Sequence, residues 1–209
     1  HQVVRRQRQM CIRDRFTTPF TYVATAEVIS ILGATPVFVD VYESTYNIDC
    51  EKLESEIKKV IFEGKLKPKA IIPVDLFGLP ARYRIINEIA EKYKLKVIED
   101  AAQSFGGSIR DVKVGVFGDV AATSFYPAKP LGCYGDGGAI FTNSDELAEK
   151  CKAIRIHGTK LDKYNSELIG LNGRLDSIQA AVLLEKLEIF QEELEMRNKV
   201  NSYYRESLN

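Results

Sequence analysis

An acid and a lysine in the stretch 97–142 each follow an apolar run that predicts a β-strand. Asp100 ends the run 96–100, and Lys129 lies in a turn rich in proline and glycine after the run 120–122. Ligands in open α/β sheets bind at the carboxyl ends of the strands. We therefore expect Asp100 and Lys129 to lie where a ligand binds rather than in a core.

Two features distinguish Lys129 from an ordinary surface lysine. Small and apolar residues surround it, and Ser124, which could bind a phosphate or hydroxyl group, precedes it by five positions. A lysine that forms a Schiff base must lose its proton easily, and partial desolvation lowers the pKa of such a lysine. The pattern is compatible with this chemistry, although most lysines in turns are solvated surface charges.

Asp100 has two interpretations that the sequence leaves open. It could cap a helix that begins at Ala101, or it could hold the cationic ring nitrogen of a cofactor such as pyridoxal phosphate, which needs a carboxylate there. Gln103 would lie on the same side of the first helical turn. Tyr22 could be a core residue or a flat ring that stacks on a flat cofactor.

Strand and helix patterns alternate along the chain, which predicts βαβ units and a mostly parallel sheet, hence an α/β fold. Asp49 and the pair Asn143 and Glu146 have the spacing of helix caps. The chain from Phe16 predicts the end of a strand and a turn at Pro19. Further predicted strands span 35–41, 70–74, 96–99, 120–122 and 139–142. Predicted helices span about 24–32, 50–61, 78–93, 144–156 and 175–190, followed by a charged helical segment to 208.

Net charge, the length of apolar runs and cysteine spacing argue against several classes of protein. The formal net charge is zero, which argues against binding to nucleic acid or to a membrane surface. No apolar run approaches the ~20 residues of a membrane span. The four cysteines have no metal-ligand spacing, so we predict no metal site and a cytoplasmic protein.

The first 15 residues differ from the rest of the chain. They carry five arginines against one aspartate, a net charge of +4, and show neither helical nor strand periodicity. A basic arm and a targeting peptide are alternatives, but transit peptides are rich in serine, which is absent here. We predict a non-native or disordered extension over residues 1–15.

Four motifs together resemble the DegT/DnrJ/EryC1/StrS family of pyridoxal-phosphate-dependent sugar aminotransferases. They are IEDAAQSFGG at 98–107, GVFGDVAATSFYPAKPLGCYGDGGAIFTN at 115–143, RIHG at 155–158 and IGLNGRLDSIQAAVLLEKL at 169–187. The resemblance implies the aspartate aminotransferase fold, with a three-layer α-β-α large domain.

The resemblance also implies a role for each candidate residue. Lys129 would carry pyridoxal 5'-phosphate as a Schiff base, and Asp100 would pair with the pyridine nitrogen. Gln103 would hydrogen-bond the phenolic oxygen of the ring. The remaining cofactor contacts would come from Ser124 at the phosphate, from the stacked ring of Tyr22, and from Asn172, which the neighbouring subunit of a homodimer contributes to the phosphate.

The same resemblance predicts the division of the chain. Residues 16–190 would form a partial cofactor-binding domain, and 191–209 a helix leading toward a C-terminal small domain. The family's phosphate-cradling turn near the N-terminus and its small domain have no counterpart in this sequence, so the predicted fold is incomplete at both ends. We expect the 209-residue chain alone to be poorly soluble and to bind the cofactor weakly.

A substrate class follows from AKPLGCYGDGG, DKY at 162–164 and IGLNGRLD. These motifs look like the subgroup that aminates C3 of a UDP-linked 2-acetamido-3-oxo-hexuronic acid, with glutamate as amino donor, for polysaccharide or O-antigen biosynthesis. Arg174 could then bind the sugar carboxylate as a bidentate donor, or it could be a surface charge.

Two other functions compete with this interpretation. One is a relative that uses the cofactor for sugar dehydration, in which histidine replaces the Schiff-base lysine, so Lys129 argues against it. The other is a non-catalytic binding or regulatory member of the same fold. A borohydride-reducible bond between the protein and the cofactor is the observation that discriminates the aminotransferase from the non-catalytic member.

Overall fold

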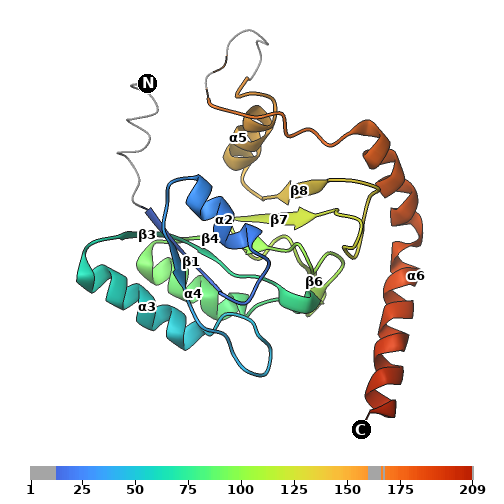
Figure 1. The fold of residues 1–209 in the computed structure, drawn as a ribbon, viewed down its shortest axis with the longest axis horizontal. Coiled ribbons are helices and arrows are strands. Elements are labelled where there is room, and N and C mark those ends of the chain that lie inside the picture. The colour runs from blue at the N-terminus through green and yellow to red at the C-terminus, as the bar shows by residue number, and fades with distance from the viewer. Residues whose placement is uncertain (1–12, 160–165, 167, 209) are drawn as a thin grey trace. The chain divides into compact units, whose positions relative to one another are not determined.

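A computed structural model describes residues 13–159, 166 and 168–208 (Figure 1). The chain divides into two compact units. The first unit contains residues up to Thr123 together with Ile140–Ala148. The second contains Ser124–Ala139 and the chain from Glu149 onward. The division at Thr123 places Asp100 in the first unit and Lys129 in the second.

The elements follow the predicted alternation of strand and helix. The strands are β1 (Arg13–Thr17), β2 (Pro36–Phe38), β3 (Lys67–Ile72), β4 (Lys96–Asp100), β5 (Ser108–Ile109), β6 (Val112–Lys113), β7 (Val120–Ser124) and β8 (Gly138–Phe141). The helices are α2 (Ala24–Ile31), α3 (Cys50–Glu63), the short 3₁₀ helix η1 (Leu76–Gly78), α4 (Tyr83–Tyr93), α5 (Asp145–Arg155) and α6 (Ser177–Ser207).

The main sheet has the strand order β2-β1-β3-β4-β7-β8. The pairings of β1 with β2 and β3, of β3 with β4, and of β4 with β7 are all parallel. The predicted mostly parallel α/β sheet is therefore confirmed. The carboxyl ends of β4 and β7 lie at one edge, where Asp100 is in register with Ala122.

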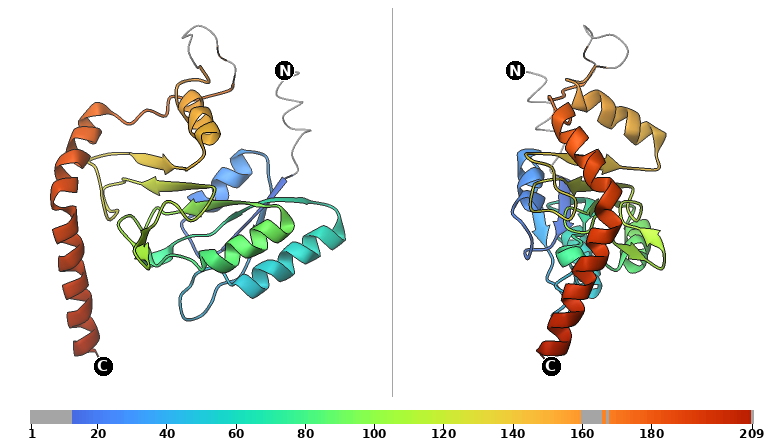
Figure 2. Two further views of the ribbon diagram at one scale, coloured as in Figure 1. Left: turned by 180° about the vertical axis from the view of Figure 1, so that it is seen from behind. Right: turned by 90° about the vertical axis from the view of Figure 1, so that its right-hand side faces the viewer.

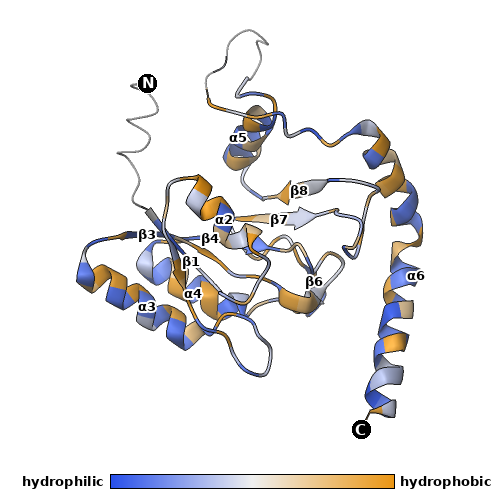
Figure 3. Cartoon of the chain, viewed as in Figure 1, coloured by the Kyte–Doolittle hydropathy of each residue, from blue (hydrophilic) through white to orange (hydrophobic). Residues whose placement is uncertain are grey.

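Helices cover both faces of the sheet in the first unit, as the right-hand view of Figure 2 shows. Ile71 packs in the core that α3 and α4 form, whereas Ile72 packs with Ile29 of α2. This split follows from the period of two along a strand, which sends successive side chains to opposite faces. Helices α3 and α4 are amphipathic, with apolar and polar residues both visible along them in Figure 3.

The ends of α3 were predictable from the sequence. Asp49 accepts hydrogen bonds from the backbone N–H groups of Glu51 and Lys52, so it caps the helix as predicted. Gly64 ends the helix in the left-handed conformation, with φ of 67°.

Several predicted boundaries were wrong. Helix α4 begins at Tyr83 rather than at 78–80, because η1 occupies the chain up to Gly78. Strand β2 is shorter than 35–41, and α6 begins at Ser177 rather than at 175 and continues through the charged segment to Ser207. The short antiparallel pair β5–β6 was not predicted.

Strand β1 also moves the boundary of the predicted N-terminal extension. Residues 13–15, which were assigned to that extension, pair with β2 and β3 in this strand. The rest of the extension, 1–12, lies outside the described residues. Its non-native origin stays a prediction.

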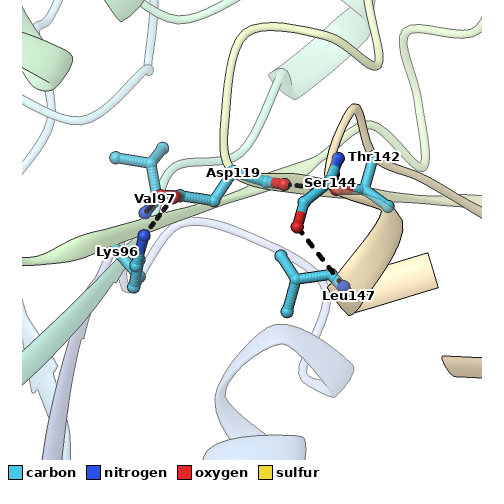
Figure 4. Close-up of polar contacts among 6 residues, drawn as sticks. All are labelled: Lys96, Val97, Asp119, Thr142, Ser144 and Leu147. Atoms are coloured by element: carbon cyan, nitrogen blue, oxygen red, sulfur yellow. Dashed lines mark hydrogen bonds and ion pairs between the residues drawn. The ribbon is translucent and has the colours of Figure 1, made fainter. Parts of the chain in front are cut away.

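Asp119 lies directly before the amino end of β7 (Figure 4). Asp100, in contrast, lies at the carboxyl end of the neighbouring strand β4. The Asp119 carboxylate accepts hydrogen bonds from Lys96 Nζ at 2.6 Å and from the Val97 N–H at 2.9 Å. Its backbone carbonyl accepts from Thr142 Oγ1 at 2.8 Å. These bonds set the register between β4, β7 and the segment that follows β8.

Helix α5 begins one residue later than the capping-box prediction for Asn143. Ser144 Oγ accepts a hydrogen bond from the Leu147 N–H at 3.3 Å, so serine is the capping side chain (Figure 4). Serine and asparagine are both good helix caps, so the capping-box spacing that selected Asn143 did not exclude the residue that follows it.

Asp14 is a buried carboxylate inside β1. It is fully buried, and among the described residues neither of its side-chain oxygens has a hydrogen-bond partner. Burial raises the pKa of Asp14, and the nearby polar groups of Thr35 and Lys67 offset this rise only in part. A buried charge without partners destabilises a fold.

We expect Asp14→Val to stabilise the first unit by about 1–3 kcal/mol at neutral pH, since it removes this desolvation cost. Because the folded-state pKa of Asp14 lies above its ordinary value, the wild type loses stability as pH rises through that folded-state pKa. The gain should therefore vanish at pH below ~3.9, the ordinary pKa of aspartate. Thermal unfolding of Asp14→Val and Asp14→Asn across pH 3–8 measures this. A valine variant less stable than wild type at pH 7 would contradict it.

None of the helices in the described part of the chain combines the length and apolar composition required to span a lipid bilayer.

Candidate active site

Asp100 is held at the carboxyl end of β4 by donors on both of its oxygens. Thr25 Oγ1, from α2, donates to Oδ2 at 2.7 Å, and the Ala102 N–H donates to Oδ1 at 3.2 Å. The side chain is half-buried. No helix follows Asp100, since residues 102–106 form a turn, so the helix-cap interpretation was wrong. Asp100 is thus a fixed carboxylate at the carboxyl end of a parallel strand, which is where ligands bind in open α/β sheets.

Gln103 lies in that turn, and its side-chain oxygen already accepts a hydrogen bond from the protein. Oε1 accepts a hydrogen bond at 2.8 Å from the N–H of Phe77, a residue in the left-handed conformation with φ of 56°. Because the oxygen faces Phe77, the amide nitrogen is the group that can donate to a ligand. Such a donor suits an anionic ring oxygen.

Tyr22 precedes α2 and is not a core residue, since 71 % of its surface is exposed. Its backbone carbonyl accepts a hydrogen bond from the Thr25 N–H. Tyr22 and Asp100 are thereby linked through a single residue, Thr25, which contacts both.

A buried carboxylate that the sequence analysis missed supports this turn. Asp75 follows β3, is fully buried, and accepts hydrogen bonds from Ser104 Oγ at 2.8 Å, from the Tyr83 hydroxyl at 2.7 Å and from the Ala81 N–H at 3.0 Å. Its own N–H donates to the carbonyl oxygen of Asp100. The signal for Asp75 was its position directly after a predicted strand, the same signal that selected Asp100.

Burial raises the pKa of Asp75 to about 6, against the lowering effect of its three donors. The folded-state pKa lies above the ordinary value of 3.8, so this group's contribution to stability is present below pH 3.8 and is lost as pH rises to about 6. A shift of roughly two units corresponds to about 3 kcal/mol.

We therefore expect Asp75→Asn to flatten the pH dependence of stability between pH 4 and 6.5, by up to about 3 kcal/mol. Asparagine keeps the shape of the side chain and an oxygen for Tyr83. Denaturant unfolding at a series of pH values measures the slope, with the exposed Asp111→Asn as the matched control. Equal slopes in wild type and Asp75→Asn would contradict the assignment.

The lysine loop, residues 124–133 of the second unit, is closed by hydrogen bonds between its own residues. The Tyr126 N–H donates to Ser124 Oγ at 3.2 Å, the Lys129 N–H donates to the Tyr126 carbonyl at 2.8 Å, and the Cys133 N–H donates to the Phe125 carbonyl at 2.8 Å. Lys129 itself is half-buried. The loop thus holds Ser124 and Lys129 in one short segment, as their spacing predicted.

Glycine at position 132 is required for this closure. A Cβ there would lie 2.5 Å from the Pro127 carbonyl oxygen, closer than atoms can approach. Helix α6 braces the same loop, because Lys186 Nζ donates to the Gly132 carbonyl at 2.6 Å and Arg197 donates to the Pro130 carbonyl at 3.3 Å. The sequence analysis did not predict this bracing.

Asn172 and Arg174 contact each other in the second unit. Arg174 Nε donates to Asn172 Oδ1 at 3.0 Å, and both side chains are exposed. Asn172 also forms an isolated antiparallel bridge with Ile156. The DKY motif at 162–164 lies outside the described residues.

The predicted site residues therefore fall into two sets. Tyr22, Asp100 and Gln103 belong to the first unit, where Asp100 ends β4, Gln103 lies in the turn that follows, and Thr25 links Tyr22 to Asp100. Ser124, Lys129, Asn172 and Arg174 belong to the second unit, in two separate segments.

Comparisons with known proteins find aminotransferases of the family that the sequence motifs resemble. The chain is 53 % identical over 196 residues to UDP-2-acetamido-2-deoxy-3-oxo-D-glucuronate aminotransferase of Pseudomonas aeruginosa, an alignment covering 93 % of this chain and 52 % of that protein. A crystal structure of a DegT DnrJ EryC1 StrS aminotransferase from Brucella abortus superposes with a TM-score of 0.92 and 56 % identity, covering 94 % of this chain and 52 % of that one.

A third similar protein was solved with a cofactor. NtdA of Bacillus subtilis, with bound cofactor PMP, has a TM-score of 0.76 and 33 % identity over 85 % of this chain and 39 % of that one. The chain thus spans about half the length of the relatives it matches. The profile of the DegT/DnrJ/EryC1/StrS aminotransferase family matches residues 13–209, and the chain belongs to this family.

Proposed function

We propose that the protein is a pyridoxal-phosphate-dependent aminotransferase that moves an amino group from glutamate to a nucleotide-linked keto-sugar. The observation that carries the proposal is the carboxylate of Asp100, which Thr25 and Ala102 hold at the carboxyl edge of a parallel sheet. Pyridoxal phosphate, when bound, supplies an electron sink that depends on a protonated ring nitrogen. A fixed carboxylate is the group that keeps such a nitrogen protonated.

The other residues have chemistry that fits the same group. Lys129 provides the amine that attaches the cofactor and can carry a proton to and from the substrate carbon. Ser124 has a hydroxyl for the phosphate, and Gln103 has an amide N–H₂ for the ring oxygen. Tyr22 presents an exposed ring for stacking.

For the substrate, we propose a UDP-linked 2-acetamido-3-oxo-hexuronic acid used in polysaccharide or O-antigen biosynthesis. Support comes from the Pseudomonas aeruginosa relative and from Arg174. Arg174 Nε donates a hydrogen bond to Asn172. The remaining N–H groups of the guanidinium have a planar arrangement that suits bidentate binding of a carboxylate. We further propose a homodimer in which Asn172 serves the phosphate of the partner's cofactor, working in the cytoplasm.

The test supplies the complete protein with pyridoxal phosphate, glutamate and a UDP-linked 3-oxo sugar acid. We expect stoichiometric 2-oxoglutarate and a 3-amino sugar, identified by mass. A dehydrated sugar would favour the dehydratase alternative instead. Absence of either product in a protein that binds the cofactor would favour a non-catalytic role.

A further inference from the structure

We propose that Thr25 is a positioning residue for Asp100, and that its hydroxyl fixes the carboxylate for the ring nitrogen of the cofactor. The inference rests on the proposed function and deepens it. It assigns a role to a residue on α2 that lies 75 positions from Asp100 in the chain.

The contact is short and shielded from water. Thr25 Oγ1 lies 2.7 Å from Asp100 Oδ2, and Thr25 is only 6 % exposed. A hydrogen bond to a charged group is shorter and stronger than one between neutral groups, and exclusion of water increases this difference. The hydroxyl of Thr25 therefore has a strong preference for one orientation, toward Asp100.

A second hydroxyl reinforces that orientation. Thr21 Oγ1 lies 3.1 Å from Thr25 Oγ1. A hydroxyl has one proton to donate, and Thr25 gives it to Asp100, so Thr21 is the donor in the Thr21–Thr25 bond. The result is a directed chain from Thr21 through Thr25 to Asp100, and successive hydrogen bonds of this kind strengthen one another.

The two donors on Asp100 have complementary effects. Thr25 holds Oδ2 and the Ala102 N–H holds Oδ1, so rotation of the carboxylate would break both bonds. An ionised carboxylate has about four acceptor positions, which leaves room for a ring N–H as a further donor. The energetic role of Thr25 is thus to hold Asp100 in one geometry before any ligand arrives.

A purely structural role is the competing explanation, because the same bond ties α2 to β4. The control is Thr142→Val, which removes a threonine hydroxyl that donates to the Asp119 carbonyl at the opposite end of β7. A structural role predicts that Thr25→Val and Thr142→Val lower the unfolding temperature and change nothing else. A positioning role adds a change at the cofactor nitrogen.

The experiment loads the complete protein with pyridoxal phosphate labelled with ¹⁵N in the ring and follows the nitrogen resonance against pH. In Thr25→Val we expect the ring nitrogen to lose its proton roughly one pH unit lower, and kcat to fall roughly tenfold with KM for the sugar little changed. Thr25→Ser, which keeps the hydroxyl, should restore both, and Thr142→Val should match the wild type in both.

Thr21→Val provides a second route if Thr25→Val does not fold. It should shift the nitrogen titration in the same direction by a smaller amount. A wild-type titration and kcat in Thr25→Val, or in Thr21→Val alone if that is the variant obtained, would overturn the inference while leaving the proposed function intact. A wild-type protein that binds no cofactor would overturn the proposed function and the inference with it.

Discussion

Lys129→Ala is expected to abolish transamination and the visible absorbance of protein-bound cofactor. Alanine has no amine, so the cofactor cannot be attached and no group remains to move the proton at the substrate carbon. The loop should still form, because its closing hydrogen bonds use backbone groups and the Ser124 hydroxyl. Absorbance spectra and single-turnover rates with glutamate measure both effects.

The matched control is Lys199→Ala, which removes an exposed lysine of α6. It should behave as the wild type in both measurements. Normal turnover in Lys129→Ala would show that Lys129 neither attaches the cofactor nor transfers the proton, contrary to the role that the family resemblance implies.

Asp100→Asn is expected to bind the cofactor but to lose at least about a hundredfold in rate, or roughly 3 kcal/mol of transition-state stabilisation. The amide keeps the shape of the carboxylate and an oxygen for Thr25, but it cannot compensate the charge of a protonated ring nitrogen. Cofactor affinity by titration and kcat by product formation separate binding from chemistry.

The exposed Asp111→Asn controls for the loss of one negative charge and should leave kcat unchanged. A turnover in Asp100→Asn within a few-fold of the wild type would mean that the carboxylate serves only the turn that contains Ala102.

Local sequence patterns predicted the elements that position the site. Hydrophobic periodicity located α3, and the Asp49 cap and Gly64 stop located its ends. The apolar run ending in an acid located Asp100 at the carboxyl end of β4. These signals succeed because helix caps, left-handed glycines and strand ends depend on near neighbours in the chain.

Tertiary contacts were not predictable in the same way. Thr25 reaches Asp100 across 75 residues, and Asp75 reaches Ser104 across 29, with no local pattern to mark either pair. The left-handed conformation of Phe77 is also unexpected for an aromatic residue. Residues that support a predicted site from distant parts of the chain, such as Thr25 and Asp75, are therefore hard to predict. Their contacts depend on which strands become neighbours, and the strand order of the whole sheet determines this.

The proposed contacts of Asn172 with the cofactor phosphate and of Arg174 with the substrate depend on residues whose sequence signal was weaker. Asn172 and Arg174 were identified through the family resemblance rather than from periodicity, and the structure brings them within hydrogen-bonding distance of each other. Their proposed partners, a phosphate and a sugar carboxylate, are anions that suit an amide and a guanidinium.

The proposed function depends above all on attachment of the cofactor to Lys129. The most direct measurement is borohydride reduction of the complete protein after incubation with pyridoxal phosphate, followed by proteolysis and mass spectrometry of the lysine-containing peptides. We expect a reduced pyridoxyl group on Lys129, in the peptide that contains Tyr126 and Pro127. Absence of the adduct, or an adduct confined to another lysine, would contradict it.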